Sequence, residues 1–210
     1  MLTGSLTNAF HLSNPFYRSE LSFFFRATHG LLVNVKPTTT LATSTSPDGE
    51  TIVLQEHDGH HFLKIGGVPL MSTTAASSEQ TMAELACEPS EKAQRVLIGG
   101  LGFGFTLRKV LELVSEDSEV VVAELLQELI DWNRDYLGEV NGRLLDDSRV
   151  SVQLKDVFKI MQGGERYDVI LLDVDNSPDP LVQKGNARLY QRRGLEIARA
   201  ALRPEGASSI

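Results

Sequence analysis

The strongest constraint on the fold is a short apolar run, residues 95–98, that leads directly into a cluster of glycines. These glycines are Gly99, Gly100, Gly102 and Gly104. Glycine lets the backbone turn sharply from a strand into a helix, and a ligand can then lie against the main chain without meeting a Cβ atom. Apolar residues recur with helical spacing between residues 107 and 114. The segment therefore predicts a strand, a ligand-binding turn and an amphipathic helix, with a tight turn that binds nothing as the alternative.

The same alternation continues to the end of the chain. Apolar runs predict strands at residues 120–123, 150–154 and 167–172, and helical patterns follow them at 125–137, 158–161 and 187–202. Apolar strands bounded by helices are typical of a parallel sheet with both faces covered. We therefore predict an α/β fold, a Rossmann-like doubly wound parallel sheet, over residues 75–210. We expect residues 203–206 to close the last helix, so that the C-terminal strands usual in such a sheet are missing.

The segment before this domain predicts a small β-meander over residues 49–74. Apolar runs at 51–56, 61–65 and 68–71 are separated by the turn pairs Asp58-Gly59 and Gly66-Gly67, which is a hairpin pattern. Ser77 with Gln80 three residues later predicts the start of the helix that follows, and Pro89 predicts its end. Residues 1–48 show little pattern beyond a polar, turn-rich stretch, so we expect an extension or a linker there.

Composition excludes several classes of function. The net charge of −8 argues against nucleic-acid binding, which needs clustered Lys and Arg. Cys87 is the only cysteine, so the chain has neither an internal disulfide nor a cysteine zinc site. No apolar run is long enough to predict a membrane-spanning helix, and the first residues do not resemble a secretory signal. We therefore expect a cytoplasmic protein without a membrane or nucleic-acid partner.

Three acidic residues stand at the carboxyl ends of predicted strands, where open α/β sheets bind their ligands. Glu124, 24 residues after Gly100, is placed to accept hydrogen bonds from both hydroxyls of a ribose. Asp156 follows the third strand and is expected to accept a hydrogen bond from an adenine amino group. Asp173 follows the fourth strand and opens an acidic, proline-rich loop. Turn formation is the alternative for acids in such a loop, but its position favours a ligand.

Two nucleoside ligands fit this layout. A dinucleotide fingerprint counted from Gly100 requires a third glycine where this chain has Phe105. An S-adenosyl ligand has no pyrophosphate and does not require that spacing, so we favour it over NAD. The expected fold is then that of class I S-adenosylmethionine-dependent methyltransferases. We expect no metal, because the spacing of His57, His60 and His61 around a hairpin turn does not suit one.

In this order of motifs the sequence resembles the spermidine synthases, over about residues 50–206. The resemblance implies an aminopropyl transfer from decarboxylated S-adenosylmethionine to an amine such as putrescine, with methylthioadenosine leaving. Gly99, Gly100, Gly102 and Gly104 match the family's glycine loop, and Glu124 and Asp156 match its ribose and adenine acids. Asp173 matches the general base that accepts the proton of the attacking amine. Asp173, Asp175 and Asn176 are the candidate residues for binding that amine.

The departures from the family pattern affect the amine and leave the nucleoside contacts intact. Leu101 and Phe103 flank Gly102 where the family carries an aspartate in the loop, and Asn176 stands in place of a second diamine-binding aspartate. Met71 lies near an expected glutamine. Three functions stay open: an aminopropyltransferase, an S-adenosylmethionine-dependent methyltransferase and a non-catalytic S-adenosyl-binding relative. A homodimer is also left open.

Overall fold

The computed structural model describes residues 23–26, 32–46, 49–87, 93–174 and 186–209. The chain divides into two compact units, Met1–Pro37 and Thr38–Ile210. In the first unit, β1 (Phe23–Arg26) pairs with β2 (Leu32–Val35) as an antiparallel ribbon. The elements of the candidate site all belong to the second unit.

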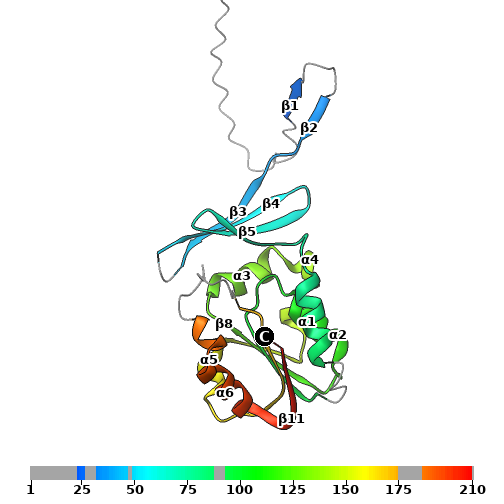
Figure 1. Cartoon of the computed structure of the whole chain (residues 1–210). Coiled ribbons are helices and arrows are strands. Elements are labelled where there is room, and N and C mark those ends of the chain that lie inside the picture. Colours follow the sequence, from blue (N-terminus) through cyan, green and yellow to red (C-terminus); the bar gives the residue numbers. More distant parts are fainter. Residues whose placement is uncertain (1–22, 27–31, 47–48, 88–92, 175–185, 210) are drawn as a thin grey trace, which may run out of the picture. The chain divides into compact units, whose positions relative to one another are not determined.

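The second unit is built around a five-stranded parallel sheet (Figure 1). Its strands are β7 (Arg95–Gly99), β8 (Glu119–Glu124), β9 (Val150–Leu154), β10 (Tyr167–Leu172) and β11 (Leu202–Ser209). They lie in the order β11-β10-β7-β8-β9. The chain therefore adds β8 and β9 on one side of β7, and then adds β10 and β11 on the other side. The predicted doubly wound α/β sheet is confirmed. Such an order places the ligand crevice at the carboxyl ends of the strands around β7 and β10.

Helices cover both faces of this sheet, because successive side chains of a strand point to opposite sides. Val96 and Ile98 pack with α1 (Ser77–Cys87) and α2 (Phe105–Leu113) on one face. Leu97 packs with α5 (Val157–Met161) and α6 (Arg192–Ala201) on the other. The remaining helical elements are α3 (Gln127–Asp135), α4 (Gly138–Asn141), η2 (Leu144–Asp146) and η3 (Asn186–Tyr190).

An antiparallel sheet precedes the parallel one in the same unit. It consists of β3 (Thr39–Thr45), β4 (Thr51–His57), β5 (His60–Ile65) and β6 (Val68–Ser72), paired in chain order. Buried residues of β4 and β5, such as Leu54 and Leu63, share an apolar cluster with Phe103 of the glycine loop and Trp132 of α3. The meander is therefore packed on the loop that we expect to bind the ligand.

Two expectations about the ends of this unit are wrong. We expected an extension or linker up to residue 48, but residues 39–45 form β3, which pairs with β4. Four of the seven residues of this strand are threonine, whose β-branched side chain suits a strand on a sheet edge. We also expected strands to be missing after the last helix, but that helix ends at Ala201 and Leu202–Ser209 form β11.

The misleading signals near β11 were Pro204 and Gly206, which indicate a turn in an isolated sequence. β11 lies at the edge of the sheet, where proline is tolerated because its missing N–H faces no neighbouring strand. The register between β10 and β11 also shifts, because Tyr167 pairs with Leu202 but Val169 pairs with Ala207. Pro204 and Gly206 lie within this irregularity of β11.

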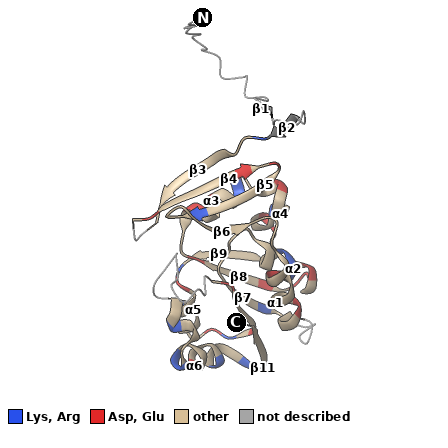
Figure 2. Ribbon diagram, turned by 45° about the horizontal axis from the view of Figure 1, so that its top comes forward, with Lys and Arg blue, Asp and Glu red and all other residues tan. Residues whose placement is uncertain are grey.

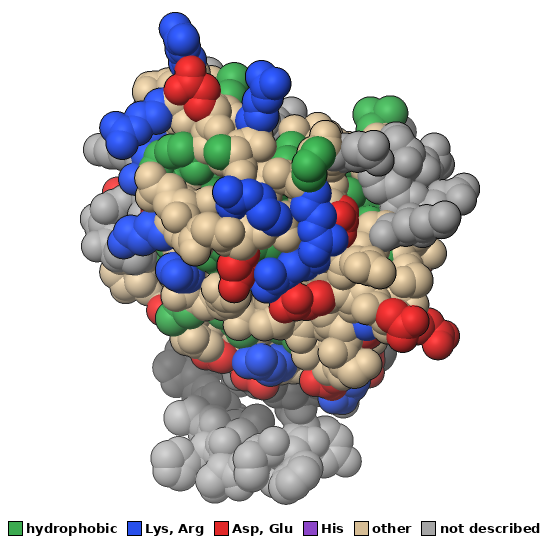
Figure 3. Space-filling model, turned by 90° about the horizontal axis from the view of Figure 1, so that it is seen from below, with side chains coloured by type: hydrophobic (Ala, Val, Ile, Leu, Met, Phe, Trp, Pro, Cys, Tyr) green, Lys and Arg blue, Asp and Glu red, His purple; other side chains and the backbone are tan. Residues whose placement is uncertain are grey.

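The arginines of the last helix are exposed. Arg192, Arg193 and Arg199 of α6 are solvent-exposed, and Arg192 pairs with Glu196 one turn later. Figure 2 shows basic residues along α6 and acidic residues distributed over the rest of the unit. Figure 3 shows the lower surface, where Lys and Arg side chains are interspersed with Asp and Glu. This mixture is typical of a solvated helix face.

The carboxylate of Asp168 joins three strands at the opposite end of the sheet from the candidate site. It accepts hydrogen bonds from the backbone N–H groups of Gln94 and Arg95 at 2.9 and 2.8 Å, and from the Arg203 guanidinium at 2.8 Å. Burial raises the pKa of Asp168, but the Arg95, Arg203 and Gln94 hydrogen bonds outweigh it and hold the pKa below its usual value. The ionised form is therefore the one that stabilises the fold.

We expect Asp168→Asn to lower the free energy of unfolding at pH 7 by about 1–3 kcal/mol, since hydrogen bonds to a charged group are lost. The difference from wild type should shrink below about pH 4, where the wild-type carboxylate becomes protonated. Urea denaturation at pH 7 and pH 3 measures both effects. Asp131→Asn, which removes an exposed 4.0 Å pair with Arg134, is the control and should change stability little. An equal loss at both pH values would mean that packing, not charge, is responsible.

Candidate active site

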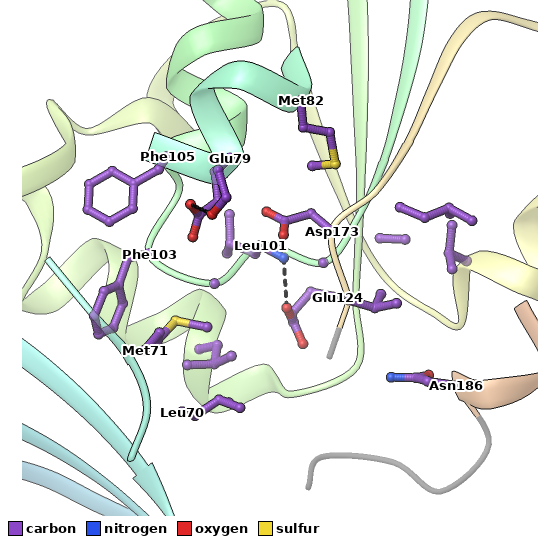
Figure 4. A pocket seen from close by; sticks show the side chains of 18 of the residues that line it. Leu70, Met71, Glu79, Met82, Leu101, Phe103, Phe105, Glu124, Asp173 and Asn186 are labelled. Atoms are coloured by element: carbon purple, nitrogen blue, oxygen red, sulfur yellow. Dashed lines mark hydrogen bonds between the residues drawn. The ribbon is translucent and has the colours of Figure 1, made fainter. Parts of the chain in front are cut away.

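A cavity of about 780 Å³ opens at the carboxyl ends of β7, β8 and β10. Its size is within the range of small-molecule sites. Five of the residues expected to bind ligand line it: Gly100, Gly102, Glu124, Asp156 and Asp173. The far wall comes from β6 and α1, so the cavity lies between the parallel sheet and the meander with its following helix. Figure 4 shows the side chains that converge on it.

The glycine loop approaches the end of β10 very closely. Gly100 has a φ of +96°, and a Cβ atom there would lie 2.0 Å from the carbonyl oxygen of Asp173. Gly104 caps the N-terminus of α2 in a left-handed conformation. Gly99 and Gly104 do not line the cavity in the described part of the chain: Gly99 packs against Val157, and Gly104 against Leu144. These two glycines shape the turn, and Gly100 and Gly102 face the ligand space.

Glu124 ends β8 and is almost fully buried, with 6% of its surface exposed. One carboxylate oxygen accepts a hydrogen bond from the Leu101 N–H at 3.0 Å, and the other accepts from the Leu125 and Leu126 N–H groups at 2.7 and 2.9 Å. Burial raises the pKa of Glu124, and the backbone hydrogen bonds oppose that rise. The carboxylate thus fixes the glycine loop to the end of β8 and lines the cavity where a ribose is expected.

Asp156 follows β9 and caps α5, accepting a hydrogen bond from the Phe158 N–H at 2.9 Å. Its second oxygen forms an ion pair with Arg188, whose guanidinium lies 4.6 Å from the centre of the Phe158 ring. Arg188 lies on η3, which brings this exposed residue to Asp156. The contact depends on residues 32 positions apart, so helical periodicity carried no signal for it.

Asp173 follows β10 and accepts a hydrogen bond from the Thr106 hydroxyl at 2.5 Å. Burial raises the pKa of this carboxyl above its usual value. The Thr106 hydrogen bond lowers it, and the charge of Glu79 on α1 raises it further. A carboxylate with a raised pKa is a stronger base, so the site holds a group suited to accept a proton.

Thr106 and Glu79 act on Asp173 and were not among the candidate residues predicted from the sequence. Thr106 lies just after the glycine loop, and Glu79 lies in the first turn of α1. A polar residue on the buried side of an otherwise apolar helix face was the one available signal for Thr106. Asp175 and Asn176, the other candidates for binding the amine, lie outside the described residues.

The residues that the structure describes contain no group of three or more His, Cys, Asp or Glu side chains that could hold a metal ion. Within the same residues, no helix has the length and apolar character needed to cross a membrane.

The family model of the spermine/spermidine synthase domain matches residues 75–209, the range that builds the parallel sheet and most of the cavity. The chain belongs to the spermine/spermidine synthase family. It is 32% identical over 131 residues to polyamine aminopropyltransferase 1 of Hyperthermus butylicus, covering 60% of this chain and 44% of that protein. It is 31% identical over 160 residues to the polyamine aminopropyltransferase of Oceanobacillus iheyensis, covering 74% of this chain and 30% of that protein. The chain thus spans less than half the length of these relatives.

Solved structures of this family share the fold. The crystal structure of spermidine synthase from Thermotoga maritima superposes with a TM-score of 0.66 at 21% identity, covering 89% of this chain and 61% of that one. A spermidine synthase in complex with the transition state analogue AdoDATO also gives 0.66, at 22% identity, covering 84% of this chain and 58% of that one. The meander and the parallel sheet are therefore arranged here as they are in this fold.

We expect Gly100→Ala to destabilise the protein by several kcal/mol. A left-handed conformation alone costs a non-glycine residue about 1–2 kcal/mol, and the new Cβ would also overlap the Asp173 carbonyl. The control is Gly164→Ala, where φ is +88° but no atom lies within 4 Å of the new Cβ. Urea denaturation of both variants separates the collision from the backbone strain. Equal losses in the two variants would contradict the close approach of the loop to β10.

Proposed function

We propose that this chain carries out aminopropyl transfer from decarboxylated S-adenosylmethionine to an amine acceptor. The observation that carries the proposal is the pairing of two carboxylates in one cavity, the buried Glu124 at the end of β8 and the half-buried Asp173 at the end of β10. The first would bind the nucleoside, and the second has a raised pKa that suits a base. Membership of the family and the names of the curated relatives support the same reaction.

The nucleoside half of the site is formed by the glycine loop and the ends of β8 and β9. Glu124 would accept hydrogen bonds from the ribose hydroxyls with the acceptor capacity that its backbone donors leave. The open main chain at Gly100 and Gly102 would admit the ligand close to the loop. Asp156 would accept a hydrogen bond from the adenine amino group. Its ion pair with Arg188 would then rearrange, or Arg188 and the adenine would share the carboxylate.

The transfer itself is a single displacement. The lone pair of the neutral amine attacks the methylene carbon beside the sulfonium, the carbon–sulfur bond breaks, and its electrons return to sulfur as methylthioadenosine leaves. Alkyl ammonium groups have a pKa near 10, so the acceptor must lose a proton to attack at neutral pH. Asp173 would take that proton, and its negative charge would hold the amine in line with the reacting carbon.

Product analysis tests the function directly. The protein is incubated with decarboxylated S-adenosylmethionine and a panel of amines, and in parallel with S-adenosylmethionine and the same amines. Methylthioadenosine in the first set is the expected result. S-adenosylhomocysteine in the second would instead indicate a methyltransferase, and neither product would indicate a non-catalytic relative.

We expect Asp173→Asn to reduce the transfer rate by about two to four orders of magnitude while leaving nucleoside binding nearly unchanged. Asparagine keeps the shape and can still accept the Thr106 hydrogen bond, but it cannot take a proton. Glu124→Gln should have the opposite profile and weaken methylthioadenosine binding about 10- to 100-fold, since charge-assisted hydrogen bonds are lost. Calorimetry and turnover measurements separate the two. Full turnover in Asp173→Asn would place the base elsewhere.

We expect Thr106→Val to shift the acidic limb of the pH–rate profile to higher pH. The reaction needs ionised Asp173, so activity falls as pH drops through the pKa of this carboxyl. The Thr106 hydroxyl stabilises the ionised form, and its removal raises the pKa further. Thr106→Ser keeps a hydroxyl and is the control. A limb that does not move would mean that another group, not Asp173, controls the reaction.

A further inference from the structure

We propose that Arg188 positions the Asp156 carboxylate for recognition of the adenine amino group. Arg188 acts from outside the cavity and through Asp156, so it is a positioning residue that does not touch the nucleoside itself. The inference rests on the proposed function, because it assigns a new residue to the nucleoside half of that site. It is drawn from the contacts among Asp156, Phe158 and Arg188.

Both oxygens of the Asp156 carboxylate have a partner in the protein. One accepts a hydrogen bond from the Phe158 N–H at 2.9 Å, and the other pairs with the Arg188 guanidinium. A carboxylate offers about four lone-pair positions, so these two contacts leave acceptor capacity for a ligand. Asp156 lines the cavity, whereas Arg188 is not among the described residues that do. Arg188 therefore holds the carboxylate without occupying the ligand space.

Two contacts are needed to fix the direction of this carboxylate. The χ2 torsion of aspartate is broad, so the plane of the carboxylate turns easily. The Phe158 N–H holds one oxygen and leaves the plane free to turn about that contact. Arg188 holds the second oxygen, and two points define the plane. The ion pair thus determines which lone pairs face the base.

Arg188 is itself held in place. Its guanidinium lies 4.6 Å from the centre of the Phe158 ring, which is within the range of a cation–π contact. Leu189, the next residue of η3, is 1% exposed and belongs to the apolar cluster against which Phe158 packs. Both contacts of Arg188 are therefore made with the start of α5, on a packed support. An arginine anchored in this way favours sharing of the carboxylate with the base over displacement by it.

A fixed carboxylate selects the base by its hydrogen-bonding groups. An ionised carboxylate accepts hydrogen bonds and cannot donate them. The exocyclic amino group of adenine donates, so it satisfies the lone pairs that Asp156 directs into the cavity. A base without this amino group leaves them without a partner, and a base with an oxygen in the same place presents a second acceptor. Arg188 is thus expected to contribute to specificity for adenine.

Calorimetry of two nucleosides tests the inference. The first is methylthioadenosine, and the second is the same compound without its 6-amino group. Wild type should bind methylthioadenosine about 10- to 100-fold more tightly, as expected for one hydrogen bond to a charged group. Arg188→Ala should weaken methylthioadenosine binding about tenfold and leave the second nucleoside unaffected. Arg188→Lys keeps the charge without the planar fork, so its ratio should lie between those two.

Arg192→Ala is the matched control. Arg192 begins α6, its side chain is 92% exposed, and it pairs with Glu196 away from the cavity, so the affinity ratio should stay at the wild-type value. Urea denaturation of every variant checks the fold, and the Arg188 ion pair should affect it little because the arginine side chain is 44% exposed.

Three results with Arg188→Ala would overturn the inference. An unchanged ratio would mean that Asp156 does not need Arg188. Tighter methylthioadenosine binding would mean that Arg188 competes with the base. Equal weakening of both nucleosides would mean that Arg188 only supports the structure of the site.

The test is independent of the transfer reaction because its readout is binding. A ratio that falls in Arg188→Ala supports the role of Arg188 even if no amine yields methylthioadenosine from decarboxylated S-adenosylmethionine. Transfer with a ratio that does not depend on Arg188 overturns the inference and leaves the proposed function intact. Failure of wild type to bind either nucleoside overturns the inference as well.

Discussion

The candidate site depends on the buried carboxylate of Glu124. A carboxylate removed from water is unfavourable unless hydrogen bonds replace its hydration, and here the N–H groups of Leu101, Leu125 and Leu126 do so. Because these donors come from two segments, the same charge fixes the glycine loop against the turn that follows β8. The loop in turn must pass the end of β10, where Gly100 leaves no room for a side chain beside the Asp173 carbonyl. The positions of the Glu124 and Asp173 carboxylates are therefore coupled through backbone atoms.

Glu124 and Asp173 show how two carboxyl groups in one cavity come to differ in their environment. Burial raises the pKa of both, but Glu124 has three backbone donors and Asp173 has one hydroxyl donor. Protonation of Glu124 would weaken the bonds that hold the loop, so its charged form is tied to the structure. Protonation of Asp173 gives up a single contact and relieves repulsion from Glu79. Of the two carboxylates, Asp173 is the one that can accept a proton without disturbing the backbone around it.

The sequence predicted those parts of the molecule that depend on local pattern. β7 to β10 were recognisable because each is a short apolar run. Glu124, Asp156 and Asp173 were recognisable as candidates because the carboxyl ends of the strands converge in a parallel sheet. β11 was missed because Pro204 and Gly206 indicate a turn unless the strand is known to lie at an edge. The contacts of Asp173 with Thr106 and of Asp156 with Arg188 join residues 67 and 32 positions apart. Sequence periodicity does not predict such pairs, because they form where segments distant in the sequence meet at the end of the sheet.

The two halves of the cavity differ in how they constrain the chain. One half consists of strand ends and a glycine loop. Main-chain positions and a buried charge define its geometry, so a substitution there disturbs the sheet itself. The opposite wall consists of side chains from β6 and α1, including Met71, Met82 and the largely exposed Leu85. These side chains can change in size or charge while the backbone beneath them stays in place. A change in this wall is thus independent of the backbone geometry that positions the Glu124 and Asp173 carboxylates.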